Sequence, residues 1–530
     1  VDGTFQGFTL TGPVVQRAEA LSAFALTAPQ IALGEASGEP GSVLLQDALI
    51  EDSGFHTVKL VSNESVLRLS DDLDLTLRPE QYQLPLASRG VLGLEEVAPV
   101  SRLEALATPG PVDPAYAAPS NLWLDSIQTA FTNDEERDPA PGSEGFPEPP
   151  NVTLELSRTG AIEVNPGGTI RIGNEGSLTV AGRLSARGGN VLLEASLPRD
   201  NEATTSSAYG LNSRRYAYLP DFALRLAPGA DIDVSGFVAE EQVPGDLSRI
   251  GRSRTRRFLG GGTVAVSSDA GYLIASETAR IDLSGGEGAV LAADQGAFAF
   301  LSGAGERVPV ATDAGRLQLT TGLGGAFFPS VDAEANTALG ARGGVLAVSL
   351  DAALRPDTAR VGSNPSYDAF TLPDAGSVAT SGTGVPVEEI QIAVSAGAVP
   401  EAARSPAGTN LSELFNRLRV DVGGFVAAGG VDVSLAARSR PLASTLRDLD
   451  SASVVSSVPV ANRILGEAGI AFAGTVDLAI PGTLVLDAPV LQSDGGTARV
   501  DAGFIRVGSS ERDYVPTDVD FPAAVDPEIK

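Results

Sequence analysis

Ala230–Gly236 reads ADIDVSG, and Ala279–Gly285 reads ARIDLSG. Each copy contains the phrase Ile-Asp-aliphatic-Ser-Gly. Successive side chains of an extended strand point to opposite faces, so the two aliphatic residues of each copy share one face and the aspartate lies on the other. Serine and glycine then favour a turn. The phrase therefore predicts a short strand with an apolar inner face, a solvated acidic outer face and a corner that leads to the next strand.

Short strands of this kind recur along the chain. Gly168–Ser196 reads as successive strands separated by turns, and 474–508 packs several more together. A related phrase occurs near opposite ends, as LTAPQI at Leu26–Ile31 and LDAPVL at Leu486–Leu491. Many short strands fit a sandwich, a propeller or a solenoid, but irregular recurrence along the whole length favours the solenoid. We therefore predict an all-β fold, a right-handed parallel β-helix (solenoid) with loop insertions.

Composition shifts divide the chain into five segments. We expect β-helix coils in 1–108, a Pro- and acid-rich insertion or linker in 109–150, coils with Arg-rich loop insertions in 151–297, coils interrupted by long excursions in 298–418, and coils with a C-terminal tail in 419–530. The excursions include a short helix expected at Asn410–Arg417 (NLSELFNR).

The composition argues against several function classes. A net charge of −30 repels nucleic acid and anionic membranes, and no apolar run is long enough to span a bilayer. The absence of cysteine excludes disulfides, zinc-thiolate sites and cysteine nucleophiles. Together with the absence of methionine, this suits an exposed extracellular protein. Because the chain begins at Val1 within a strand-like phrase, we interpret it as a processed or internal piece of something longer.

Several phrases resemble the β-helical shaft of filamentous haemagglutinin-type exoproteins, which bacteria export by two-partner secretion. They are GSLTVAGRLSARGGNVLL (Gly176–Leu193), PGADIDVSG (Pro228–Gly236), ARIDLSGG (Ala279–Gly286) and TLVLDAPVL (Thr483–Leu491). The family's secretion domain carries an Asn-Pro-Asn-Gly-type motif, whereas this chain has NPGGTI at Asn165–Ile170, which we read as an ordinary turn. The chain therefore resembles an internal shaft segment.

The resemblance implies a non-enzymatic structural or adhesive fibre segment, secreted or at the bacterial cell surface, with a role in adhesion or biofilm. In this interpretation the coils form a stiff shaft, and the insertions contact a host or matrix glycan or surface, or other copies of the chain. An outer-membrane secretion partner is implied by the family. Two alternatives stay open: a carbohydrate-active β-helix enzyme (polysaccharide lyase or glycosidase), and a polymerising subunit of a surface filament.

One basic stretch stands out in this acidic chain. Arg249–Arg257 reads RIGRSRTRR, and clustered guanidinium groups bind sulfate, carboxylate or phosphate. The stretch predicts a site for an anionic glycan, formed by Arg249, Arg252, Arg254, Arg256 and Arg257. The alternative interpretation is a loop that neutralises its acidic neighbours Glu240, Glu241 and Asp246.

We expect no catalytic residue and no dedicated metal site. His56 is the single histidine and lies between a turn and a strand without a partner motif, which argues against a catalytic relay or a multi-His site. Carboxylates are abundant, but Asp233, Asp282 and Asp432 alternate with aliphatic residues and are expected to face water, not to form the desolvated pair that glycosidic cleavage needs. No cofactor is expected, although adventitious Ca²⁺ fits so acidic a surface.

Overall fold

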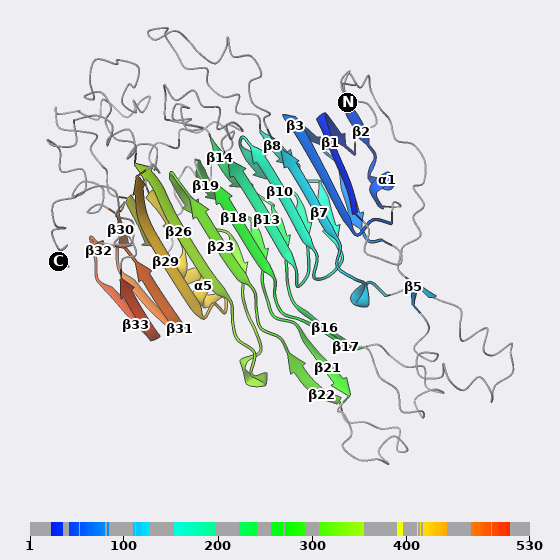
Figure 1. Ribbon diagram of the computed structural model, residues 1–530. Helices are drawn as coiled ribbons and strands as arrows, with labels where there is room; N and C mark the ends of the chain where they lie inside the picture. Colours follow the sequence, from blue (N-terminus) through cyan, green and yellow to red (C-terminus); the bar gives the residue numbers. More distant parts are fainter. Residues whose placement is uncertain are drawn as a thin grey trace, which may run out of the picture.

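The computed structural model describes a stack of parallel strands (Figure 1). Its described part is mostly β, with 61% in strands and 6% in helices. The strands form three parallel sheets of twelve, nine and six strands and three two-stranded antiparallel pairs. The described residues are 23–34, 42–51, 54–79, 82–83, 110–111, 113–127, 153–196, 222–240, 256–268, 271–291, 307–354, 390–395, 411, 414, 417–441, 468–488 and 490–508.

The twelve-stranded sheet runs the length of the stack. Its strands, in spatial order, are β2 (Val43–Leu45), β1 (Ala23–Leu33), β3 (Thr57–Leu69), β7 (Asn121–Ser126), β10 (Thr169–Glu175), β13 (Asn190–Ser196), β18 (Thr263–Ser268), β23 (Arg316–Thr321), β26 (Val345–Leu354), β29 (Asp432–Pro441), β31 (Val476–Asp487) and β33 (Ala498–Gly508).

The other two parallel sheets complete each level of the stack. The nine-stranded sheet contains β32 (Val490–Asp494), β30 (Ala468–Ala473), β27 (Ile390–Ser395), β28 (Arg417–Val420), β24 (Gly324–Phe327), β19 (Tyr272–Ala275), β14 (Ala223–Leu226), β11 (Leu178–Val180) and β8 (Leu154–Leu156). The six-stranded sheet contains β25 (Ser330–Asp332), β20 (Arg280–Asp282), β15 (Asp231–Asp233), β12 (Arg183–Ser185), β9 (Ala161–Val164) and β4 (Asp74–Leu77).

From β8 to β26 the chain visits the nine-, six- and twelve-stranded sheets in turn, and each visit adds a strand beside the previous one. Two described strands lie out of chain order: β28 lies between β24 and β27 although β27 precedes it in the chain, and β2 lies on the far side of β1 from β3. We call one such set of successive strands a rung.

Two antiparallel hairpins leave the stack between the six- and the twelve-stranded sheets. One pairs β16 (Phe237–Glu240) with β17 (Arg256–Leu259), and the other pairs β21 (Glu287–Leu291) with β22 (Arg307–Ala311). They project on the same side of the stack (Figure 1). The remaining elements are the pair β5 (Tyr82–Gln83) and β6 (Gly110–Pro111), the short helices α1 (Asp47–Glu51) and α5 (Val422–Ala427), and the 3₁₀ turns η1 (Pro114–Tyr116) and η4 (Thr337–Leu339).

One aliphatic core runs through the stack. In the twelve-stranded sheet, Ile170, Val191, Val264 and Leu317 are partners on successive strands, and each is at most 1% exposed. Parallel strands in register place identical faces above one another, so an apolar position on one rung is covered by apolar positions on its neighbours. Inward side chains of all three sheets belong to this core, whereas Ala223, Tyr272 and Ile274 of the nine-stranded sheet belong to a second, smaller cluster.

The repeated Ile-Asp-aliphatic-Ser-Gly phrases occupy the same position on adjacent rungs. Ile232 pairs with Ile281 and both are fully buried, as are the aliphatic residues Val234 and Leu283, which confirms the predicted inner face. The aspartates pair on the outer face. The prediction that alternate side chains of each phrase point inward is therefore correct for both copies.

The aspartates themselves are less solvated than predicted. Oδ1 of Asp233 accepts hydrogen bonds from the backbone N–H (3.0 Å) and the hydroxyl (2.7 Å) of Ser235. Asp282 binds Ser284 in the same way, at 3.0 and 2.6 Å. Their side chains are only 19% and 18% exposed. The third predicted outer aspartate, Asp432, accepts from the backbone N–H of Thr483 at 2.8 Å. These carboxylates hold corners in place in addition to facing solvent.

The glycine that ends each phrase is required by the hairpin that follows. A Cβ at Gly236 would lie 2.5 Å from the carbonyl oxygen of Leu259, and a Cβ at Gly285 would lie 2.1 Å from that of Thr312. Leu259 and Thr312 lie where the two hairpins return to the stack. Only a residue without a side chain fits between the departing and returning chain.

The first half of 109–150 contains β7, which pairs with β3 and β10 inside the twelve-stranded sheet, so this half is not a linker; 128–150 lie outside the described residues. Within 298–418, where coils interrupted by excursions are expected, 307–354 contain strands β22 to β26. The helix expected at Asn410–Arg417 does not reach its end, because Arg417 begins β28; most of its other residues lie outside the described part.

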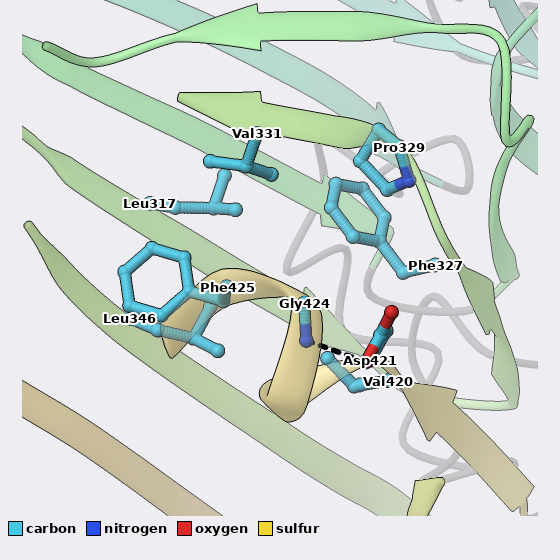
Figure 2. Close-up of a pocket in the computed structure, with 9 residues that line it drawn as sticks. All are labelled: Leu317, Phe327, Pro329, Val331, Leu346, Val420, Asp421, Gly424 and Phe425. Carbon is cyan, nitrogen blue, oxygen red and sulfur yellow. Dashed lines mark hydrogen bonds between the residues drawn. The ribbon is translucent and has the colours of Figure 1, made fainter. Parts of the chain in front are cut away.

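Helix α5 takes the place of a strand beside the last strand of the six-stranded sheet. The backbone N–H of Ala333, next to β25, donates to the carbonyl of Ala428 at the end of α5 (2.8 Å). Phe425 points from α5 toward Leu317, Phe327 and Leu346 across a cavity of about 30 Å³ (Figure 2). The carboxylate of Asp421 on the rim accepts a hydrogen bond from the N–H of Gly424 at 2.8 Å and caps the helix. The cavity is therefore a packing gap of about one water molecule.

We expect Phe425→Ala to lower the free energy of unfolding by about 3–5 kcal/mol, because it deletes a buried ring and enlarges a cavity that already exists. Phe425→Leu keeps most of the apolar volume and is expected to cost about 1 kcal/mol. Urea unfolding followed by circular dichroism measures both values. Equal stability of Phe425→Ala and the parent chain would show that α5 does not close the core.

Candidate functional site on the outer face of the twelve-stranded sheet

Four adjacent strands of the twelve-stranded sheet carry charged and aromatic residues on their outer face. In one row, Lys59 of β3, Trp123 of β7 and Arg171 of β10 are register partners; in the next, Asp125 of β7 and Glu194 of β13 flank Gly173 of β10. We call this group the Arg171 cluster: Lys59, Trp123, Asp125, Arg171 and Glu194.

Arg171 bridges the two carboxylates. Its Nη1 lies 3.2 Å from Oδ2 of Asp125, and its Nη2 lies 3.0 Å from Oε2 of Glu194. Gly173 makes room for this arrangement, since a Cβ there would lie 2.7 Å from Oδ1 of Asp125. The guanidinium thus joins three successive strands through side-chain hydrogen bonds in addition to the main-chain ladder.

Asp125 is the most buried carboxylate of the cluster, with a side chain 10% exposed. Burial raises its pKa above the ordinary value of 3.8; the positive charges of Arg171 and Lys59 oppose this shift and the negative charge of Glu194 adds to it. A raised pKa beside a second carboxylate is one requirement of glycosidic acid catalysis. Here, however, the guanidinium of Arg171 occupies the space between the two carboxylates.

Trp123, the only tryptophan of the chain, is partly covered by a cation. Nζ of Lys59 lies 5.5 Å from the centroid of the indole, a cation–π distance. The indole Nε1 is buried and has no hydrogen-bond partner among the described residues. The ring therefore contributes to packing on the sheet instead of offering a bare stacking surface.

A shallow groove continues along the same face beyond the cluster. It crosses β18, β23, β26 and β29 and has a volume of about 290 Å³. Small and hydroxylated side chains line it, and its described lining contains no carboxylate: Ala265, Ser267, Gln318, Thr320, Ala347, Ser349, Ser434, Ala436 and Arg438, with three core residues beneath. Arg438 at its end is held by Asp487 at 2.6 Å. The groove offers hydroxyl groups and one paired cation, without an acid or a base.

Two of the five arginines predicted to bind an anionic glycan hold the first hairpin on the stack. Nε of Arg256 lies 3.0 Å from Oε1 of Glu240 across the hairpin, as the neutralising interpretation expects. Arg257 donates to the carbonyl oxygens of Ala115 (3.2 Å), Ala117 (2.6 Å) and Pro166 (2.6 Å).

Burial lowers the pKa of Arg257, and its guanidinium also lies over the ring of Phe237. Through these hydrogen bonds, Arg257 holds the β16–β17 hairpin against loops of earlier rungs. Arg249, Arg252 and Arg254 lie outside the described residues, so the structure brings two of the five together in an intramolecular role.

His56 is buried near the start of β3, 6% exposed. Its Nδ1 has no hydrogen-bond partner among the described residues, and burial lowers its pKa below 6.5.

In the described part of the chain, no group of three or more His, Cys, Asp or Glu side chains could hold a metal ion. Within those same ranges no helix is long and apolar enough to cross a bilayer.

Sequence reasoning missed the Arg171 cluster because its members are spread over 59–194 and meet only through the strand register. The signal present in the sequence was Trp123-Leu124-Asp125, a tryptophan and a carboxylate at alternate positions of a strand. The acidic, Pro-rich residues around that strand concealed it.

No protein-family model matches the chain, no curated protein matches it, and no solved structure matches it. The resemblance to haemagglutinin-type exoproteins therefore stays a prediction from the sequence phrases.

Arg171→Met is expected to lower the free energy of unfolding by about 2–3 kcal/mol at pH 7, because it leaves the Asp125 carboxylate buried without its partner. Because the pKa of Asp125 is raised in the folded state, this carboxyl group ionises first in the unfolded chain as pH rises above about 4. The loss of stability in Arg171→Met therefore grows as pH rises. Urea unfolding at several pH values measures this.

The double variant Asp125→Asn/Arg171→Met serves as the control for that measurement. It removes the buried charge, so most of the pH-dependent part of the loss is expected to disappear. A loss that is independent of pH in Arg171→Met, and equal in both variants, would mean that Arg171 acts through packing alone.

The single histidine makes the environment of His56 directly measurable. We expect the one imidazole Cε1–H signal in the proton NMR spectrum to titrate with a midpoint below 6.5, because burial disfavours the charged ring. In 8 M urea the same signal is expected to titrate near the ordinary value, about 6.5. A folded midpoint at or above the value in urea would contradict the buried placement.

Proposed function

We propose that the three parallel sheets wind as a right-handed parallel β-helix. The repeated visit to the nine-, six- and twelve-stranded sheets supports this winding, and parallel strands joined by crossovers are right-handed in nearly all known cases. The hairpins and helix α5 are then local departures at the corners. The reversed order of β27 and β28 is a non-sequential insertion into the stack, and β2 is a second one at its other end.

We further propose that this stack is a non-enzymatic structural or adhesive shaft segment of a large, secreted bacterial exoprotein of the haemagglutinin type. The observation that carries the proposal is the in-register stack itself: nine successive strands of one sheet, β3 to β31, share one row of buried aliphatic residues. Such a stack spans distance and resists bending because each rung hydrogen-bonds to the next. Twelve strands spaced about 4.8 Å apart give a shaft of about 50–55 Å.

The outer face supports a non-enzymatic function. Arg171 bridges Asp125, whose pKa is raised by burial, to Glu194, and the described lining of the groove beside them presents hydroxyls without an acid or base. The single histidine is buried. A carbohydrate-active enzyme is the second candidate, because Asp125 and Glu194 lie on strands two positions apart in one sheet.

Ligand contacts are assigned to the insertions. The first hairpin, β16–β17, carries the segment with Arg249, Arg252 and Arg254 and is fastened to the stack by Arg257. In the proposal, these three arginines bind sulfate or carboxylate groups of a host or matrix glycan at the bacterial surface. Secretion through an outer-membrane partner is part of the proposal and rests on the sequence resemblance.

Retention on heparin and alginate columns tests the ligand. Arg249→Ser/Arg252→Ser/Arg254→Ser is expected to elute at clearly lower salt than the parent chain. The matched control is Arg183→Ser/Arg280→Ser/Arg342→Ser, which removes the same charge from exposed shaft arginines, with side chains 59%, 58% and 69% exposed. Equal elution of the two triple variants would refute the assignment to the hairpin.

Polysaccharide cleavage tests the second candidate. Incubation of the chain with alginate or pectin is expected to release neither reducing ends nor unsaturated uronate products that absorb at about 235 nm. Cleavage that is abolished by Asp125→Asn and by Glu194→Gln would replace the adhesive shaft with an enzyme whose acid pair is the Arg171 cluster.

A further inference from the structure

β33 is the last described strand of the twelve-stranded sheet, and among the described residues it forms an edge. β33 pairs with β31 on one side, and no described strand pairs with its other side. Eleven residues thus present main-chain donors and acceptors at the end of the twelve-stranded sheet. Long uncovered edges pair readily with another strand, and native proteins usually shorten or cover them.

The core is open at the same place. Ile505 and Val507 pair with Leu484 and Leu486, which face the core, so both point into the interior. They are nevertheless 44% and 57% exposed, because no described rung covers them. Phe504, on the outer face, is 61% exposed. Large apolar side chains gathered at one end of a molecule mark an interaction surface.

The opposite end of the stack is better covered. There β2 adds a short strand to the second half of β1, and α1 packs against β4. Ile31, Leu33, Leu45 and Ile50 are all buried. Phe24 in the first half of β1 is half-buried and packs on Phe55 with ring centroids 5.4 Å apart. Among the described residues, the end that carries β33 therefore exposes larger apolar side chains than the opposite end, where β2 would obstruct head-to-tail pairing along the second half of β1.

β33 bends at a corner, and this restricts how a second copy could pair with it. Opposite Gly503, strand β31 has two residues, Pro481 and Gly482, so the register shifts there. Inward residues are Ala498, Val500 and Ala502 before the corner, and Ile505 and Val507 after it. The alternation of faces therefore changes at Gly503.

When β33 pairs antiparallel with β33 of a second copy, one register places the two corners opposite each other and inward residues opposite inward residues. With the two-fold axis between Gly503 and Phe504, Val500 lies opposite Val507 of the second copy and Ala502 lies opposite its Ile505. The inward residues meet inward residues, and the two cores join. On the outer face, Phe504 lies over Gly503 of the second copy, where no side chain obstructs it.

The same register brings opposite charges together. Asp501 and Arg506, both exposed, become direct partners across the junction, twice because of the two-fold axis. Opposed residues of antiparallel strands have Cβ atoms about 4.5–5.5 Å apart, within reach of an Asp–Arg ion pair. Neither residue forms an ion pair within the described chain, so both are available for this contact.

We propose that the chain forms a tail-to-tail dimer in which β33 pairs antiparallel with β33 of a second copy, with Asp501 opposite Arg506. The interface is isologous, so each copy contributes its β33 edge once and this contact joins two copies. This inference rests on the edge strand and its residues, and it is independent of any glycan contact by the hairpin.

Sedimentation velocity of the 530-residue chain over a range of concentrations tests the dimer. The parent chain is expected to show a concentration-dependent dimer. Asp501→Arg and Arg506→Asp each turn two attractive pairs into two repulsive ones, so each is expected to raise the dimer Kd about 30- to 100-fold. Arg499→Asp, on the same strand but opposite Gly508, is the matched control and is expected to keep the Kd of the parent within about twofold.

An equimolar mixture separates a specific register from damage to the fold. Asp501→Arg and Arg506→Asp chains have complementary charges at both positions, so together they are expected to form a heterodimer with nearly the Kd of the parent. Far-UV circular dichroism confirms that each variant is folded. A monomeric parent chain, a mixture that does not associate, or an Arg499→Asp chain as weak as the other two would overturn the proposal.

Discussion

Parallel main-chain hydrogen bonding in exact register is the constraint on which the rest of this structure depends. Once a strand pairs with its neighbour residue for residue, each inward side chain is covered by the same position of the next rung. A row such as Ile170, Val191, Val264 and Leu317 can therefore stay apolar without any long-range specificity. A polar group in that row would face apolar neighbours on both sides, so variation is confined to the outer face and the corners.

Side chains and glycines at the corners determine the turns, which the main-chain hydrogen bonds between rungs do not. Asp233 and Asp282 bind the serine two residues later and hold the turn, while the following glycine allows a hairpin to leave and return. Beyond β25, α5 replaces a strand and Phe425 fills the interior from a helix. Insertions are tolerated at corners because they do not alter the register of the strands on either side.

The sequence predicted what depends on local alternation. The inner positions of the Ile-Asp-aliphatic-Ser-Gly phrases and the parallel, all-β character follow from period-two patterns and turn residues. It could not predict what depends on which strands meet. β7 was hidden by its Pro- and acid-rich surroundings, and Arg171 was unremarkable until the register placed Asp125 and Glu194 on either side of it. Arg257 likewise looked like a ligand for anions until the fold surrounded it with carbonyl oxygens.

A stack of open sheets has two ends, unlike a barrel, and each end must be finished in some way. Continuation by another rung would pair strands in parallel and permit a filament, whereas a two-fold junction pairs them antiparallel and stops growth. The acidic surface opposes any association of copies, since each carries a net charge of −30. At physiological ionic strength, charges farther apart than a Debye length of about 8 Å are largely screened from one another. The contacts of Asp501, Arg506 and the apolar side chains at the edge act at shorter range, so they decide whether two copies meet at β33.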